Sequence, residues 1–179
     1  MKMMTTMLVP LCAMTLSAQS VDLRHLDRLA EKTGEVVNVT LDENLIRLAA
    51  SFLRGAGPEL AEVRKILPGL KGIYVRSFTF ESDNVYSPAD VEKIEQQLKG
   101  WSTVVEVKSG RKRETSKVMM KLGTGIVVLN CAPRELTVVN IEGSITVEQL
   151  EKLGGHLGIP EVDLKKDKAA SKDKKDEEE

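Results

Sequence analysis

The longest unbroken run of basic side chains in the sequence is Arg111, Lys112 and Arg113, which lies between Lys108 and Lys117. Guanidinium and ammonium groups gathered in this way can bind phosphate, lipid headgroups or an acidic protein. The same run also suits the solvated tip of a β-hairpin, where charge discourages pairing between sheet edges. Both interpretations stay open, and we treat the run as part of a candidate interaction surface.

Arg76 is the second part of this candidate surface. It stands two residues after Tyr74 in a predicted strand, so the two side chains share a face, and we expect that face to lie near the basic run. If Arg76 points into a concave apolar pocket, binding of a small molecule or an anion is favoured. A flat, solvated surface around Arg76 would count against that function.

Side chains that could catalyse a reaction or bind a metal are few and scattered. The histidines are His25 and His156, and Cys131 is the only cysteine beyond residue 20. Metal-ligand spacings, a nucleophile elbow and a phosphate-binding loop are missing from the sequence. We therefore predict no enzymatic activity, no metal and no cofactor, with Cys131 as a small buried residue. A site assembled from His25, His156 and Glu142 remains an alternative, which a separation beyond about 10 Å would exclude.

Composition excludes several classes of function. The 179 residues include 26 basic and 27 acidic side chains, so the formal net charge is −1 and no global field attracts nucleic acid or an anionic membrane. Aromatic residues make up only 3% of the chain, too few for a base-stacking surface. Because 41% of residues are hydrophobic and 30% charged, we expect an ordinary globular domain that binds no nucleic acid.

Residues 1–20 have the composition of a secretory signal peptide. An apolar stretch, Met7–Leu16, precedes small residues, and cleavage is expected after Ala18 or after Ser20. Cys12 stands too early for a lipoprotein anchor. We therefore expect a periplasmic or secreted protein, not a lipoprotein, with no transmembrane segment once the signal is removed.

The other end of the chain is also predicted to be separate from the core. Residues 165–179 contain six lysines, six acidic residues and no apolar side chain larger than alanine. Such a segment cannot bury enough surface to offset the entropy of ordering it, so we predict a disordered charged tail. Residues 21–164 then form a single domain.

Five helices are predicted from the spacing of apolar residues and from residues that begin or end helices. They run from Asp22 to Gly34, over Leu45–Phe52 up to Gly55, from Pro58 to Leu67, from Ser87 to Gly100 and from Thr146 to Gly154. One apolar stripe of each of the first two helices is expected to face the core. These stripes are Leu23, Leu26 and Ala30 in the first, and Leu45, Leu48, Ala49 and Phe52 in the second.

Capping boxes should begin two of these helices, since Ser87 precedes Asp90 and Thr146 precedes Gln149 by three residues. Asp83 lies in the polar stretch before Ser87. This stretch lacks the spacing of acidic residues and the glycine of a calcium-binding loop, so we assign Asp83 to turn formation.

Six β-strands fill the remaining segments, and the last four, joined by short turns, predict an antiparallel meander. The strands are expected at Val36–Leu41, Gly72–Phe80, Thr103–Lys108, Glu114–Leu122, Gly125–Cys131 and Glu135–Gly143. Gly125–Cys131 is apolar at nearly every position, which predicts a strand covered on both faces. A β-bulge near Arg76-Ser77 would explain why the apolar phase changes there. The fold class is therefore α+β, an antiparallel sheet packed with about five helices.

The run Glu135–Ile145, continued through Leu150 to Gly158-Ile159-Pro160, resembles the closing motif of a bacterial exported family catalogued as a domain of unknown function, number 4252. Val36–Leu41 and Leu70–Arg76 also fit that family. The resemblance spans roughly residues 23–160. It implies an exported protein of the bacterial envelope and supplies no catalytic residues.

Three functions follow from these observations. The first is a non-catalytic envelope protein that binds another protein or has a regulatory role. The second is a periplasmic module that binds a small molecule or an anion. The third is an enzyme with a dispersed site.

Overall fold

The computed structural model describes residues 21–55, 57–154 and 156, and within them it forms four α-helices, four 3-10 helices and six strands. In chain order these are η1 (Arg24–Lys32), β1 (Glu35–Asp42), α1 (Glu43–Phe52), η2 (Leu53–Gly55), η3 (Pro58–Leu60), α2 (Ala61–Ile66), η4 (Leu67–Gly69), β2 (Leu70–Thr79), α3 (Pro88–Gln97), β3 (Ser102–Ser109), β4 (Glu114–Lys121), β5 (Gly125–Ala132), β6 (Glu135–Gly143) and α4 (Val147–Leu153), where η marks a 3-10 helix. The predicted signal peptide and the predicted tail lie outside the described residues.

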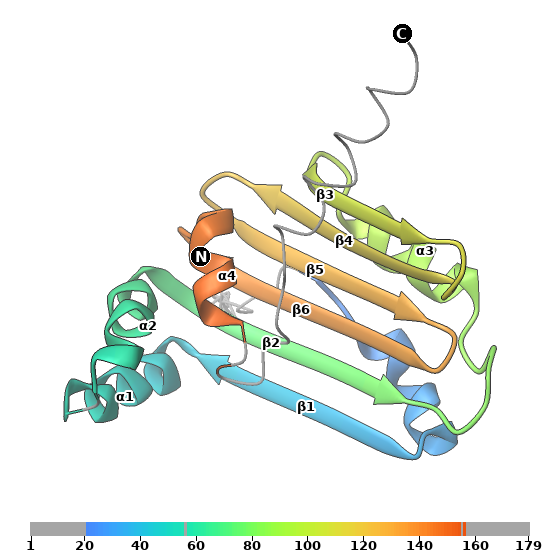
Figure 1. The fold of residues 1–179 in the computed structure, drawn as a ribbon, viewed down its shortest axis with the longest axis horizontal. Helices are drawn as coiled ribbons and strands as arrows, with labels where there is room; N and C mark the ends of the chain where they lie inside the picture. The colour runs from blue at the N-terminus through green and yellow to red at the C-terminus, as the bar shows by residue number, and fades with distance from the viewer. Residues whose placement is uncertain (1–20, 56, 155, 157–179) are drawn as a thin grey trace, which may run out of the picture.

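The strands form one antiparallel sheet in the order β1-β2-β6-β5-β4-β3 (Figure 1). The meander predicted for the last four strands is confirmed, and the α+β class with it. The first two strands pair with each other and join the meander through β2 and β6. Strands β1 and β3 are therefore the edges of the sheet within the described part of the chain.

Both faces of the sheet are covered, and each has its own apolar core. Figure 1 views the sheet from the side of α4, with η1 and α3 behind the strands. The face that packs against α1, α2 and α4 is called the α4 face, and the face that packs against η1 and α3 is called the α3 face.

The central strand β5 contributes to both cores. Ile126 and Val128 point to the α4 face, whereas Val127 and Leu129 point to the α3 face, and all four are buried. This confirms that β5 is covered on both sides, as its continuous apolar sequence predicts.

The β-bulge predicted near Arg76-Ser77 is wrong. The pairing of β2 with β6 runs without interruption from Gly72 to Thr79, and the irregularity lies between Leu70 and Gly72. The apolar phase changes because Ile73 and Val75 fill the core of the α4 face, whereas Phe78 fills that of the α3 face. A strand covered on both faces can change the side of its apolar residues without a bulge.

The first helix exists, but the stripe predicted for it is partly wrong. It is a 3-10 helix, η1, and its buried residues are Leu26 and Leu29, whereas Ala30 is exposed. A 3-10 helix has three residues per turn, so Leu23, Leu26 and Leu29 lie on one side of it. In an α-helix, with 3.6 residues per turn, residue 30 would lie on that side instead of residue 29.

The buried stripe predicted for the second helix is also wrong. In α1 the buried residue is Ile46, which is 1% exposed, and Ala50 packs beside it against the same core. Leu45, Leu48 and Phe52 are 44%, 51% and 77% exposed. The apolar part of α1 is wider than the stripe that the sheet covers, so the core receives one side of it and water the other.

Two capping boxes are confirmed. Ser87 and Asp90 bond reciprocally at the start of α3, and Thr146 and Gln149 do so at the start of α4. No helix of the described residues is long and apolar enough to cross a membrane.

Candidate functional site

A hollow of about 520 Å³ lies on the α3 face, between α3 and strands β4 and β5. This volume is within the range of small-molecule sites. Its apolar lining is Tyr86, Pro88, Val91, Leu129, Cys131 and Pro133. Its polar lining is Asn84, Glu92, Glu95, Arg113, Thr115 and Lys117. We call this hollow the α3 cavity.

Three parts of the fold form the α3 cavity. Pro88, Val91 and Glu95 recur at helical spacing, so they present one side of α3 as a wall. The floor consists of side chains from paired residues of β4 and β5, where Lys117 lies opposite Leu129 and Thr115 opposite Cys131. The turn between β3 and β4 and the loop before α3 form the outer end.

The inner end of the cavity contains a cation held by two carboxylates. The Nζ atom of Lys117 lies 2.5 Å from Oε1 of Glu95 and 3.3 Å from Oε1 of Glu106. The hydrogen bond with Glu95 raises the pKa of Lys117 above its ordinary value, against the opposing effect of burial. These three side chains therefore link α3 to β3 and β4, and the two carboxylates compensate the positive charge of Lys117.

At the outer end, by contrast, one carboxylate is bonded to two positively charged groups. Asp83 accepts hydrogen bonds from Arg134 Nε at 2.8 Å and from Arg113 at 2.5 Å. These bonds, that from Arg134 first, lower the pKa of Asp83 below its ordinary value. Because two guanidinium groups share this one carboxylate, the group of Asp83, Arg113 and Arg134 carries one positive charge in excess.

Cys131 lies on the floor of the cavity and packs with the core of the α3 face. Burial, helped by the negative charge of Glu95, raises the pKa of its thiol to about 11. At neutral pH the side chain is therefore a neutral thiol, which is weakly nucleophilic. Its neighbour Tyr86 donates a hydrogen bond from its hydroxyl to the carbonyl oxygen of Ala132 at 2.7 Å.

The structure does not place the two parts of the candidate interaction surface together. Arg76 lies on β2 and donates a hydrogen bond to Asp27 Oδ1 at 2.5 Å. It lines a small hollow of about 100 Å³ whose other residues include Asn38, Thr40 and Tyr74. Strands β6 and β5 separate it from β4 and the basic run.

The basic run lies in the turn between β3 and β4, as predicted, with Arg113 in the left-handed region at φ 54°. Arg113 lines the cavity and Arg111 is exposed. The Nζ atom of Lys112 lies 4.0 Å from Oε2 of Glu114. Sequence reasoning missed the contribution of Asp83 and Arg134. They are 51 residues apart in the chain, so no local spacing connects them.

The residues of the dispersed catalytic alternative lie on different sides of the sheet. The Nε2 atom of His25 donates to the carbonyl oxygen of Asp90 at 3.1 Å on the α3 face. His156 follows α4, which packs on the opposite face. Within the described residues no three His, Cys, Asp or Glu side chains are grouped so that they could hold a metal ion.

A second surface of interest is the exposed side of α1, formed by Leu45, Leu48 and Phe52, which we call the α1 apolar surface. At the end of the helix, Arg64 donates hydrogen bonds to the carbonyl oxygens of Leu53 at 3.3 Å and Arg54 at 3.2 Å. These bonds hold the guanidinium group of Arg64 close to the exposed Arg54.

The sequence model of one protein family, described as "Domain of unknown function (DUF4252)", matches residues 31–153. This range is more than half of the chain and contains all strands of the sheet, the α1 apolar surface and the α3 cavity. No curated protein and no solved structure matches the chain significantly.

Proposed function

This chain belongs to the family described as Domain of unknown function (DUF4252), and within that family we propose that it is an exported envelope protein that binds another protein without catalysis. Export is supported by the signal-like composition of residues 1–20. Binding is supported by one observation above all, the α1 apolar surface.

The α1 apolar surface has the geometry of a helix that docks in a groove. Its residues stand at positions i, i+3 and i+7 of one helix, the spacing of anchors in helix-in-groove recognition. Full burial of an exposed apolar side chain contributes on the order of 1.5–3 kcal/mol, so Phe52, which is 77% exposed, would gain most of this and the half-exposed Leu45 and Leu48 about half, before the costs of association. Ile46 anchors the opposite side of α1 to the core, so the exposed parts of these three side chains take no part in that contact.

The partner that fits is a protein with an apolar groove that has acidic residues at one end. Arg54 follows α1, and Arg64 of α2 donates hydrogen bonds to the carbonyl oxygens of Leu53 and Arg54, so both arginines lie beside the C-terminal end of α1. Acidic side chains on the rim of the groove would pair with these two guanidinium groups and fix the direction of the helix.

Site-specific cross-linking tests this proposal. A photoreactive amino acid replaces Phe52 in one form of the protein and Leu122 in a control form, and both are expressed in cells that make the protein. Leu122 is a suitable control because it is apolar and 94% exposed, in the turn between β4 and β5. We expect one heterologous adduct at position 52 and none at position 122.

The captured protein is then purified and its affinity is measured with two variants. Leu48→Ser should weaken binding about tenfold or more, since a buried leucine anchor is lost, and Leu122→Ser should leave it unchanged. An adduct between two copies of this chain, the same adducts at both positions, or equal affinities of both variants would contradict the proposal.

A further inference from the structure

We propose that the α3 cavity binds an anionic amphiphile, an unbranched apolar chain that ends in an anionic head group such as a carboxylate. The head group lies at the outer end beside Arg113, and the apolar chain extends along the floor toward Lys117. This site is separate from the α1 apolar surface, so the inference does not depend on the proposed function.

The middle of the cavity supplies the apolar contact. Leu129 is buried at the floor, Cys131 lies beside it, and Val91 and Tyr86 face them from the other wall. The raised pKa of Cys131 keeps its thiol neutral, so this part of the lining carries no charge at neutral pH. A ligand with an apolar body is therefore favoured over a uniformly polar one.

The spacing of two lining residues is compatible with an extended ligand. Arg113 and Lys117 mark the two ends of the cavity and are four residues apart along the turn and β4. At about 3.3 Å per residue of extended chain, this separation is at most about 13 Å. An unbranched chain can fill a groove of this length between α3 and the strands.

The charges favour a negative head group at the outer end. Arg113 and Arg134 share the single carboxylate of Asp83, and Arg111 on the same turn adds a further positive charge. A carboxylate head could accept two parallel hydrogen bonds from a guanidinium group there.

The inner end of the cavity does not favour a negative head group. Lys117 already contacts Glu95 and Glu106, so its charge is compensated. Glu92, which also lines the cavity, is exposed, and water screens its charge. The polar arrangement therefore orients the ligand with its head outward.

Calorimetric titration with simple amphiphiles tests the inference on the full chain, below the concentrations at which they form micelles. In a series of carboxylates from hexanoate to dodecanoate, affinity should rise roughly fourfold per methylene until the cavity is filled, and then stop rising. Decanol should bind about tenfold more weakly than decanoate, and decyltrimethylammonium more weakly than decanol. Equal affinities for decanoate and decyltrimethylammonium, or no saturable binding of decanoate, would overturn the inference.

Two variants locate the head group. Arg113→Gln should weaken decanoate binding about tenfold and leave decanol binding unchanged, since only the charged head contacts the guanidinium group. The matched control is Arg47→Gln, which removes an exposed arginine from α1, on the far face of the sheet. If the two variants bind decanoate equally well, the head group does not lie at Arg113 and the inference is wrong.

The unmodified chain offers a second test, in which folding of a variant plays no part. Cys131 lies on the cavity floor, so bound decanoate should protect it from methyl methanethiosulfonate at pH 9. The modified fraction is measured by mass spectrometry of the peptide that contains Cys131. We expect at least fivefold slower modification with saturating decanoate and much weaker protection by decyltrimethylammonium at the same concentration. Unchanged modification with saturating decanoate would place the ligand elsewhere and overturn the inference.

Discussion

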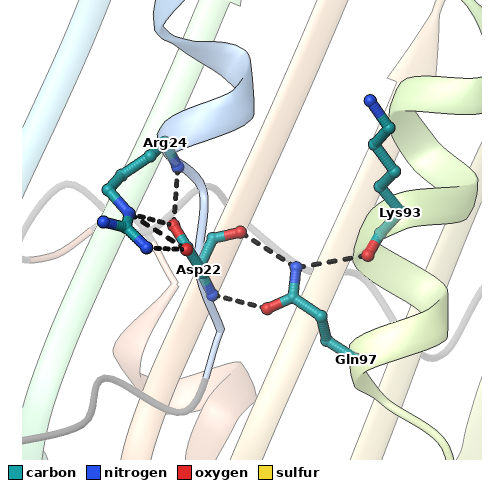
Figure 2. Close-up of polar contacts among 4 residues, drawn as sticks. All are labelled: Asp22, Arg24, Lys93 and Gln97. Carbon is teal, nitrogen blue, oxygen red and sulfur yellow. Dashed lines mark hydrogen bonds and ion pairs between the residues drawn. The ribbon is translucent and has the colours of Figure 1, made fainter.

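The side-chain amide of Gln97 pairs with both backbone polar groups of Asp22, 75 residues away in the sequence. The Asp22 amide donates to Gln97 Oε1 at 2.7 Å, and Gln97 Nε2 donates to the Asp22 carbonyl oxygen at 2.9 Å (Figure 2). The same Nε2 atom donates to the carbonyl oxygen of Lys93 at 3.2 Å. The segment that leads into η1 is thus fixed to the last turn of α3, the helix that forms a wall of the cavity.

Gln97→Ala should remove this connection and lower the free energy of unfolding by about 1 kcal/mol, since the bonds are exposed to water. Hydrogen exchange of the Asp22 amide should accelerate at the same time. The control is Gln96→Ala, an exposed neighbour in the same helix with the same change in helix propensity. Equal stabilities and equal exchange rates in the two variants would show that the pairing does not hold the segment.

Asp90 should make the stability of the protein depend on pH in the acid range. Burial raises the pKa of this carboxyl, but hydrogen bonds from Ser87 and Arg28 outweigh burial and leave the pKa below its ordinary value. A lowered native pKa means that the carboxylate stabilises the fold above about pH 4, the value for an unfolded chain, and loses this effect as the pH falls through the native pKa.

Asp90→Asn should therefore be less stable than the unchanged protein at pH 7, by about 1–3 kcal/mol. The difference should shrink as the pH is lowered from 4 to 2, because protonation removes the same charge from the unchanged protein. Denaturant unfolding across this range measures both quantities. A difference that stays constant with pH would mean that the charge of Asp90 contributes nothing.

The capping box of α4 predicts the effect of a third substitution. The Gln149 amide donates to Thr146 Oγ1 at 3.3 Å, and the Thr146 amide donates to Gln149 Oε1 at 2.9 Å. Thr146→Ala should cost about 1 kcal/mol in denaturant unfolding, since both bonds depend on this arrangement. Ser144→Ala, a similar change at an exposed residue just before the helix, should cost much less. No loss with Thr146→Ala would contradict the cap.

The sheet could be predicted from the sequence because the residues that define its strands and turns lie close together in the chain. The alternation of apolar residues and the short turns at Gly123 and Pro133 define four of its strands within one or two residues. Capping boxes likewise depend on residues three positions apart, and both were confirmed.

The orientation of α1 could not be predicted in this way. Its apolar residues cover more of the helix than the sheet can bury, so the spacing of Leu45, Leu48 and Phe52 is as good a core stripe as that of Ile46 and Ala50. Only the position of the neighbouring strand decides between them.

The α3 cavity was hidden for a different reason. Its lining comes from a loop, a helix, two strands and two turns between Asn84 and Pro133. The charge at its outer end depends also on Asp83 and Arg134, which meet only in the fold. Arg113 stood out in the sequence as part of a basic run, but nothing local shows that its side chain lines a cavity while those of Arg111 and Lys112 do not.

Removal of the tail should leave the fold almost unchanged. Residues 165–179 contain no apolar side chain larger than alanine, so we expect truncation after Leu164 to remove no apolar packing. The midpoint of thermal unfolding should shift by less than about 5 °C. A larger decrease would show that the tail packs against the domain, and the two forms can be compared in one calorimetric experiment.

Cys131 should react slowly with alkylating reagents, and its reaction should report on its burial. With a pKa of about 11, its thiolate fraction at pH 8 is roughly two orders of magnitude below that of an ordinary thiol. The greater intrinsic nucleophilicity of a more basic thiolate recovers about one order of magnitude of the reaction rate.

Alkylation of Cys131 by iodoacetamide should therefore be at least tenfold slower than that of an exposed cysteine, introduced as Leu122→Cys in a Cys131→Ser background. The rate at Cys131 should continue to rise up to about pH 11, whereas that at position 122 should level off earlier. Equal rates and equal pH profiles would show that burial does not control this thiol.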